Sequence, residues 1–68
     1  MTQQWWNGSR LKAARKRKGL TQAGLAERVG VGQVTIARME TGTRGPSVPM
    51  LLKLAKALRV PMEQLIAK

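Results

Sequence analysis

The stretch QAGLAERVGVGQVTIARME, residues 22–40, decides the fold. It divides into two segments with apolar residues at helical spacing, separated by Gly30-Val31-Gly32. Two helices that cross at a steep angle need a small residue where they approach closely, and Ala26 supplies it. The chain must also reverse within about three or four residues, which Gly30 permits because glycine readily adopts a positive φ. The pattern therefore predicts two short helices joined by a tight turn.

These two helices are expected to share one core and to leave one face of the second helix exposed. The side chains predicted to point into the core are Leu25, Val29, Val31, Ile36 and Met39. The opposite face of the second helix then presents Gln33, Val34, Ala37 and Arg38. None of these four is acidic, so the face is suited to contact with the edges of nucleic-acid bases.

Cap residues and glycines predict the limits of the first three helices. A first helix is expected over about residues 9–18, with Ser9 as its N-cap and Gly19 after its end. Thr21 is the expected N-cap of the helix over residues 22–29. The third helix is predicted from Gln33 to Thr41.

Two further helices are predicted after the loop over residues 43–46. Ser47 is the expected N-cap of a fourth helix that continues to Leu58, with Pro49 in its first turn. Pro61 is expected to open a short last helix. The fold class predicted from these segments is a compact all-α domain of five helices.

Composition excludes several classes of protein. The 68 residues contain no cysteine and no histidine, which excludes disulfides and Cys/His zinc sites. Because aspartate and tyrosine are absent as well, no pair for acid–base or nucleophilic catalysis can be assembled, and we expect neither an enzyme nor a cofactor. Thirteen lysines and arginines oppose three glutamates, and the net charge of +10 indicates a polyanionic partner such as nucleic acid.

The sequence predicts a cytoplasmic protein associated with the nucleoid. The first residues lack the charged and apolar regions of a signal peptide. No apolar run approaches the roughly 20 residues that span a bilayer, and the many glycine breaks argue against a long amphipathic helix on a membrane surface.

One further pattern extends from Leu11 to Leu65, almost the whole chain. It comprises Arg15, Gly19-Leu20-Thr21-Gln22, Leu25-Ala26-Glu27, Gly30-Val31, Thr35-Ile36, Glu40, Gly42, Pro46 and the run LLKLAKAL over residues 51–58. This pattern resembles the Cro/CI-type (XRE) family of lambda-repressor-like helix-turn-helix DNA-binding domains. The resemblance implies a sequence-specific regulator of transcription, a repressor, that binds double-stranded DNA. We assign residues 1–8 to an N-terminal arm and residues 9–68 to the DNA-binding domain.

The resemblance also implies roles for individual residues. Gln33, Val34 and Arg38 fall at the base-reading positions of the recognition helix Gln33–Thr41, which would lie in the major groove. Chemically, Gln33 can pair with adenine and Arg38 with guanine, and Val34 can pack on a thymine methyl. The phosphate contacts that we expect are Gln22, Thr35, Thr41, Thr43 and Arg44. The chain departs from the family at Gly32, where serine or threonine usually caps the recognition helix.

Two structural roles follow from the same resemblance. Arg15 and Glu40 are expected to form an ion pair between the first and third helices that holds the recognition helix in orientation. The last helix is the usual dimer contact, so Met62, Leu65 and Ile66 are expected to join two subunits of a homodimer. Such a dimer would place its recognition helices in successive major grooves, at half-sites about 10 bp apart.

Some interpretations stay open at the level of sequence. Trp5 and Trp6 are the only aromatic residues, and they can complete the core, contact a second subunit or stack on unpaired bases. An alternative function is a protein-interaction module of the same fold, such as an antitoxin or a protein that bridges transcription factors. Its surface would then carry an apolar patch for a protein partner, around the tryptophans and the last helix.

Overall fold

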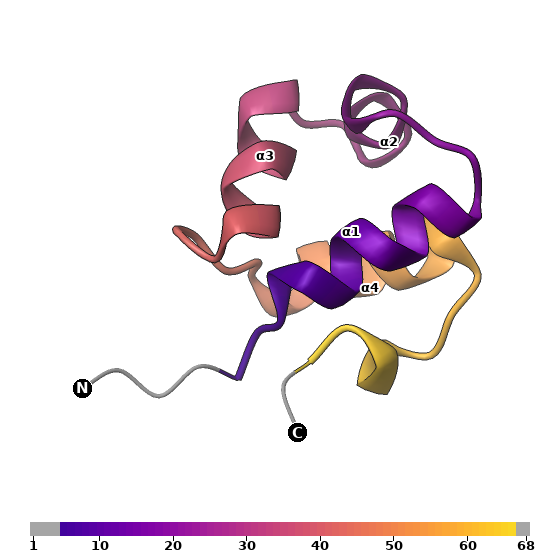
Figure 1. Cartoon of the computed structure of the whole chain (residues 1–68). Coiled ribbons are helices and arrows are strands. Elements are labelled where there is room, and N and C mark those ends of the chain that lie inside the picture. The colour runs from indigo at the N-terminus through magenta and orange to yellow at the C-terminus, as the bar shows by residue number, and fades with distance from the viewer. Residues whose placement is uncertain (1–4, 67–68) are drawn as a thin grey trace.

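The computed structural model describes residues 5–66 and contains four α-helices and one short 3-10 helix (Figure 1). The elements are α1 (Gly8–Arg17), α2 (Gln22–Val29), α3 (Gln33–Thr41), α4 (Val48–Leu58) and η1 (Met62–Gln64). Helix α3 packs against both α1 and α2, and α2 packs against α4. None of the helices within residues 5–66 is both long and apolar enough to cross a bilayer.

The limits of α2, α3 and α4 agree with the sequence prediction, because each is marked by local signals. The Thr21 hydroxyl accepts a hydrogen bond from the Gly24 N–H at 2.9 Å. The Ser47 hydroxyl accepts one from the Met50 N–H at 3.2 Å. Helix α3 ends at Gly42, which has φ 83°.

The prediction of Ser9 as the N-cap of the first helix is wrong. Helix α1 begins one residue earlier, at Gly8, and Asn7 is its N-cap. The Asn7 side chain accepts a hydrogen bond from the Arg10 N–H at 3.2 Å. Its backbone N–H is bonded to the Leu65 carbonyl at 3.2 Å, so the C-terminal segment fixes the residue that starts the helix.

The predicted fifth helix is a single 3-10 turn, η1. Pro61 precedes it and supplies no side-chain cap. After this turn the chain is extended at Ile66, which forms an isolated antiparallel bridge with Trp6. Because that bridge requires extended backbone, the segment does not continue as an α-helix.

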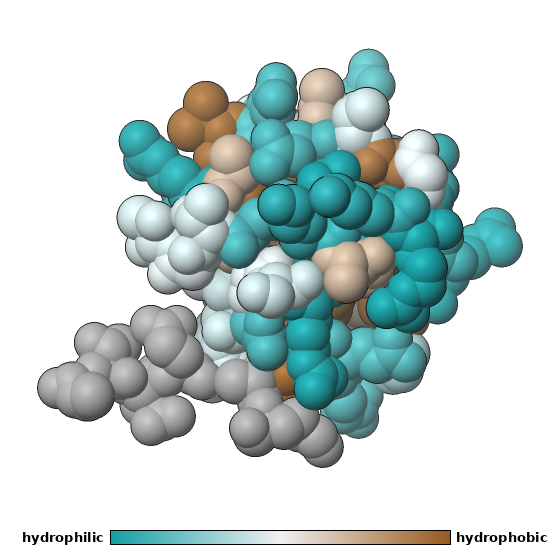
Figure 2. Space-filling model, viewed as in Figure 1, coloured by the Kyte–Doolittle hydropathy of each residue, from teal (hydrophilic) through white to brown (hydrophobic). Residues whose placement is uncertain are grey.

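The core is formed by apolar side chains from all four α-helices together with Trp6 and Leu65. The core residues predicted from the central stretch are buried, except that Val31 is half-buried at the core's edge. Trp6 is only 4% exposed, so the segment before α1 contributes to the core of the domain. The face turned to the viewer in Figure 2 is mainly hydrophilic, and hydrophobic residues show there only as separate patches.

Candidate nucleic-acid interface

The turn between α2 and α3 has the geometry that its sequence predicts. Gly30 follows α2 with φ 78°, a left-handed conformation that glycine adopts without steric cost. The next residue, Val31, donates its N–H to the Ala26 carbonyl at 3.0 Å and so closes the turn. Ala26 is 3% exposed, as expected of a small residue at the helix crossing. This turn places α3 against α2 with one face turned outward.

The outward face of α3 carries the three residues expected to read bases. Gln33, Val34 and Arg38 are all exposed. Val34 and Arg38, four residues apart, are neighbours on one helical face, and Gln33 lies at the edge of that face. Val34 is 64% exposed, an apolar side chain with little protein around it, and therefore available to a partner's apolar group.

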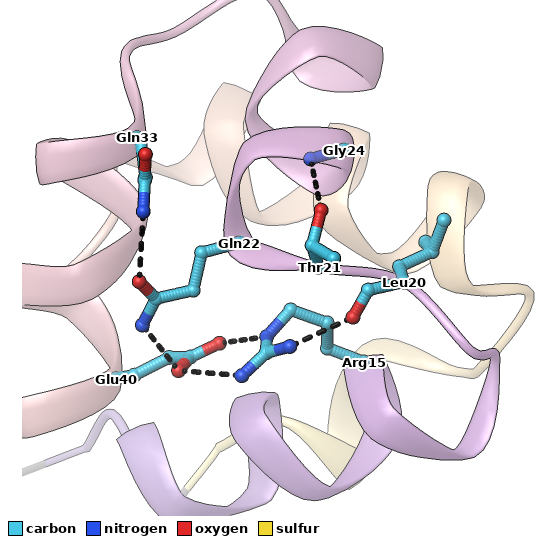
Figure 3. Close-up of polar contacts among 7 residues, drawn as sticks. All are labelled: Arg15, Leu20, Thr21, Gln22, Gly24, Gln33 and Glu40. Atoms are coloured by element: carbon cyan, nitrogen blue, oxygen red, sulfur yellow. Dashed lines mark hydrogen bonds and ion pairs between the residues drawn. The ribbon is translucent and has the colours of Figure 1, made fainter.

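A chain of polar contacts links this face to the body of the domain (Figure 3). The Arg15 guanidinium donates from Nε to Glu40 Oε2 at 2.5 Å and from Nη2 to Glu40 Oε1 at 3.2 Å. It also donates from Nη1 to the Leu20 carbonyl at 2.7 Å. The ion pair expected between Arg15 and Glu40 is thus present and bidentate.

Gln22 continues this chain of contacts to the start of α3 (Figure 3). Its Nε2 donates to Glu40 Oε1 at 3.0 Å. A carboxylate only accepts hydrogen bonds, so this contact fixes which end of the Gln22 amide is the nitrogen. The Gln22 Oε1 is then left to accept from Gln33 Nε2, at a longer distance of 3.5 Å. Gln22, expected to contact phosphate, is half-buried and contacts both Glu40 and Gln33, and its amide NH2 has a second hydrogen to donate.

The environment of Glu40 favours its charged form. Burial alone raises the pKa of this carboxyl, but hydrogen bonds from Arg15 and Gln22 lower it. The positive charges of Arg15 and Lys12 lower the pKa further, and it lies below its ordinary value of 4.5. The ion pair therefore persists at neutral pH and ties the last turn of α3 to α1.

The segment before α1 holds the same end of α3, a role that sequence reasoning missed. The Trp6 Nε1–H donates to the Met39 carbonyl at 2.7 Å. Gly8 is buried, and a Cβ at this position would overlap the backbone carbonyls of Met39 and Glu40. Only glycine allows α1 to start so close to α3, and no spacing in the sequence indicated this contact.

The other expected phosphate contacts surround the end of α3. Thr41 and Thr43 are exposed, and their hydroxyl oxygens lie 3.0 Å apart. The Arg44 N–H bonds back to the Arg38 carbonyl at 3.3 Å, which places this loop beside the helix. Arg44 and Thr35 line one pocket of about 150 Å³, together with Ser47. The Thr41 hydroxyl donates to the Arg38 carbonyl at 3.1 Å. These groups form a polar rim next to the outward face of α3.

The expected dimer contact requires a correction. Leu65 is fully buried within the chain, because it packs in the core and bonds to Asn7 through its carbonyl. It is therefore unavailable to a second subunit. Met62 is 37% exposed and Ile66 is half-buried, so these two residues reach the surface.

Comparison with known proteins places this geometry in a family. The helix-turn-helix family model matches residues 11–65. The HTH-type transcriptional repressor RghR of Bacillus subtilis is 42% identical over 62 residues, covering 90% of this chain and 46% of RghR. The chain spans about half the length of the curated relatives it matches.

Solved structures agree with this placement. The restriction-modification controller protein C.AhdI from Aeromonas hydrophila has a TM-score of 0.79 and 37% identity, over 84% of this chain and 83% of its own. The P22 c2 repressor in complex with a synthetic operator has a TM-score of 0.81 and 37% identity, over 85% of this chain and 89% of its own. The chain therefore belongs to the helix-turn-helix family, with the Cro/CI-type domain that its sequence pattern indicates.

Proposed function

We propose that this protein binds double-stranded DNA with sequence preference and represses transcription, with α3 in the major groove. The observation that carries the proposal is the outward face of α3, where Gln33, Val34 and Arg38 stand exposed on a helix anchored to α1 and α2. The net charge of +10 supports a polyanionic partner. The relatives support it as well, since RghR is a transcriptional repressor and the P22 c2 repressor is solved with an operator.

Each residue on the face has a chemical role in this proposal. Arg38 donates two hydrogen bonds to a guanine, and Gln33 pairs with an adenine. Val34 packs on a thymine methyl group. The long, exposed contact of the Gln33 amide with Gln22, at 3.5 Å, restrains its orientation before DNA arrives, which reduces the entropy lost on binding.

The polar rim positions the helix on the DNA backbone. Thr35, Thr41, Thr43 and Arg44 contact phosphates on either side of the groove in this proposal. Gln22 also contacts a phosphate in this proposal, through the amide hydrogen that it does not donate to Glu40.

The proposal includes a homodimer on a symmetric site. Met62 and Ile66 form the contact, at the surface next to η1. A two-fold axis there would place two copies of α3 in successive major grooves, about 34 Å apart.

Selection from a random duplex library tests the proposal, followed by binding of the selected and a scrambled duplex at several salt concentrations. We expect a symmetric motif to be enriched. Arg38→Ala and Gln33→Ala should each weaken specific binding by about tenfold, from the 1–3 kcal/mol of a bidentate base contact.

Arg17→Ala is the matched control, because it removes the same charge from α1 on the side that faces η1. It should weaken binding to the selected and the scrambled duplex equally. Binding that shows no motif, and that Arg38→Ala and Arg17→Ala weaken equally while the uncharged change Gln33→Ala has no effect, would contradict sequence recognition and leave only counterion release.

A further inference from the structure

Three of the four α-helices are followed by a glycine in the left-handed conformation, and α4 is the exception. Gly19, Gly30 and Gly42 have φ values of 72°, 78° and 83°. After α4 the same place is taken by Arg59, with φ 57° and ψ 45°. In residues 5–66 it is the one non-glycine residue with a positive φ. An L-residue pays a steric cost in this conformation, so an arginine here needs a reason that lies in its side chain.

The Arg59 side chain lines a pocket of about 220 Å³ together with two other cations, Lys18 and Arg28. The three cations come from three places in the chain: the end of α1, the last turn of α2 and the end of α4. Leu20 and Ala57 complete the lining, and no acidic residue takes part. Within residues 5–66, the three cations form no ion pair with an acid of the chain.

A second pocket, of about 560 Å³, continues from the first and shares Arg28 and Ala57 with it. It adds Lys53 and Lys56, against a single acid, Glu27. Cations near helix C-termini also complement the helix dipole, which accounts for Arg28 and Lys56. Arg59 follows α4 and shares this effect, but it takes on a steric cost that glycine at this position would avoid.

This pocket lies apart from the proposed DNA-reading face. No residue of α3 lines either pocket. In Figure 1 the ends of α1 and α4 meet on the side of the molecule away from α3, and Figure 2 shows that side as hydrophilic. An anion bound there would therefore be a ligand additional to the duplex in the groove.

We propose that Lys18, Arg28 and Arg59 form a second anion site, which binds a phosphate-bearing ligand with two or more phosphate groups. Three exposed cationic residues, two arginines and a lysine, line one pocket that has no acidic residue in its lining, which suits phosphate oxygens through charge-assisted hydrogen bonds. The continuation toward Lys53 and Lys56 gives room and charge for further phosphate groups.

Calorimetric titration of the full chain with inorganic triphosphate, at constant ionic strength, tests the site. We expect saturable binding with one triphosphate per chain. Arg59→Gly and Arg28→Ala should each weaken it by about tenfold, the loss of one charge-assisted contact. Arg17→Ala, which removes an equal charge from the side facing η1, should change the affinity less than twofold.

Arg59→Gly also separates loss of the site from loss of the fold. Glycine relieves the steric cost at a positive φ, so the variant should unfold at a higher temperature than the wild type while binding triphosphate less tightly. Absence of saturable binding, or equal weakening by Arg17→Ala and Arg59→Gly, would overturn the proposal, since either result means diffuse attraction to net charge.

A duplex titration identifies the source of the phosphate. If Arg59→Gly lowers the salt dependence of duplex binding by about one counterion, the ligand is the backbone of a nucleic acid. If duplex binding is unchanged while triphosphate binding is lost, the ligand is a small phosphorylated molecule. Arg38→Ala should leave triphosphate affinity unchanged, which keeps this test independent of the proposed DNA recognition.

Discussion

The two ends of α3 are held in different ways. At the C-terminal end, Glu40 receives hydrogen bonds from Arg15 and Gln22, and the Met39 carbonyl receives one from Trp6. Gly8 lies against the carbonyls of the same two residues. At the N-terminal end, Gly32 is the N-cap and makes no side-chain hydrogen bond. The long contact from Gln33 to Gln22 is the side-chain hydrogen bond of that end.

The contacts at the C-terminal end of α3 restrain the orientation of the helix. Contacts to α1 and to the segment before it fix the last turn of α3, far from the residues at its start. The first turn keeps its exposed side chains and its free N–H groups for a partner. The C-terminal contacts, together with the packing of α3 on α2, therefore determine the direction in which Gln33 and Val34 point.

Filling the space at Gly8 is expected to have the largest effect on stability, through the C-terminal end of α3. Gly8→Ala places a methyl group on the backbone carbonyls of Met39 and Glu40, which cannot move without shifting α3. We expect a loss of about 3 kcal/mol in the free energy of unfolding, measured by urea denaturation. Gly45→Ala is the control, because its methyl group would meet only ordinary contacts with the tryptophans. Equal stability of the two variants would mean that α1 and α3 are not in close contact.

Removing the charge of Glu40 is expected to have the next largest effect, and one that depends on pH. The pKa of Glu40 is lowered in the fold, so its contribution is complete above the unfolded value and is lost as pH falls through the folded value. Glu40→Gln should cost about 2 kcal/mol near pH 7, since Arg15 loses its counter-ion, and should flatten the stability profile below about pH 5.

Urea denaturation between about pH 3 and pH 7 measures this dependence. Glu63→Gln is the control, because Glu63 is exposed and its loss should leave the profile unchanged. Parallel profiles for the wild type and Glu40→Gln would show that Glu40 does not carry the acid sensitivity.

Trp6→Phe is expected to have a smaller effect than the changes at Gly8 and Glu40. Phenylalanine keeps most of the buried apolar surface but removes the shorter of the two hydrogen bonds to the Met39 carbonyl, leaving the one from the Gly42 N–H at 3.3 Å. We expect thermal unfolding to show a loss of about 1–2 kcal/mol. Trp5→Phe, at a residue that is 47% exposed, should have little effect on stability. A larger loss of stability from Trp5→Phe than from Trp6→Phe would mean that Trp5, and not Trp6, holds the end of α3.

At the N-terminal end of α3, a substitution at Gly32 should stabilise the helix slightly. Gly32→Ser adds a side-chain N-cap where a Cβ meets no other atom within 4 Å. Serine caps better than glycine by about 0.3 kcal/mol, so a rise of one or two degrees in melting temperature is expected. Gly32→Ala provides the comparison, because it adds the methyl group without the hydroxyl and should not stabilise.

The limits of the helices and the exposed residues of α3 could be predicted from the sequence. The limits of α2 and α3 follow from Thr21, Gly30 and Gly42, because caps and left-handed glycines act within a few residues. The exposed residues of α3 follow from helical spacing in the same way. The pairing of Arg15 with Glu40 came from the family pattern, since its partners are 25 residues apart.

The parts that could not be predicted depend on contacts between distant segments. Asn7 and Ser9 are both good N-caps, and the choice of Asn7 depends on its bond to Leu65. The contacts of Gln22 with Glu40 and Gln33 join residues 18 and 11 positions apart, and no local signal at the start of α2 indicates them. Leu65 looked like a dimer contact, although the bridge between Trp6 and Ile66 draws that segment into the core.

The most direct test of the contacts at the C-terminal end of α3 is the affinity of Glu40→Gln for a selected and a scrambled duplex, measured where the variant is fully folded. Glu40 is 8% exposed, so it acts on DNA only by orienting α3 and through its charge. Removing a negative charge alone should tighten binding to both duplexes, as Glu63→Gln should do. We predict that Glu40→Gln instead binds the selected duplex several-fold more weakly and leaves the scrambled duplex no weaker. If Glu40→Gln and Glu63→Gln both bind the two duplexes more tightly, and to the same extent, Glu40 does not orient α3.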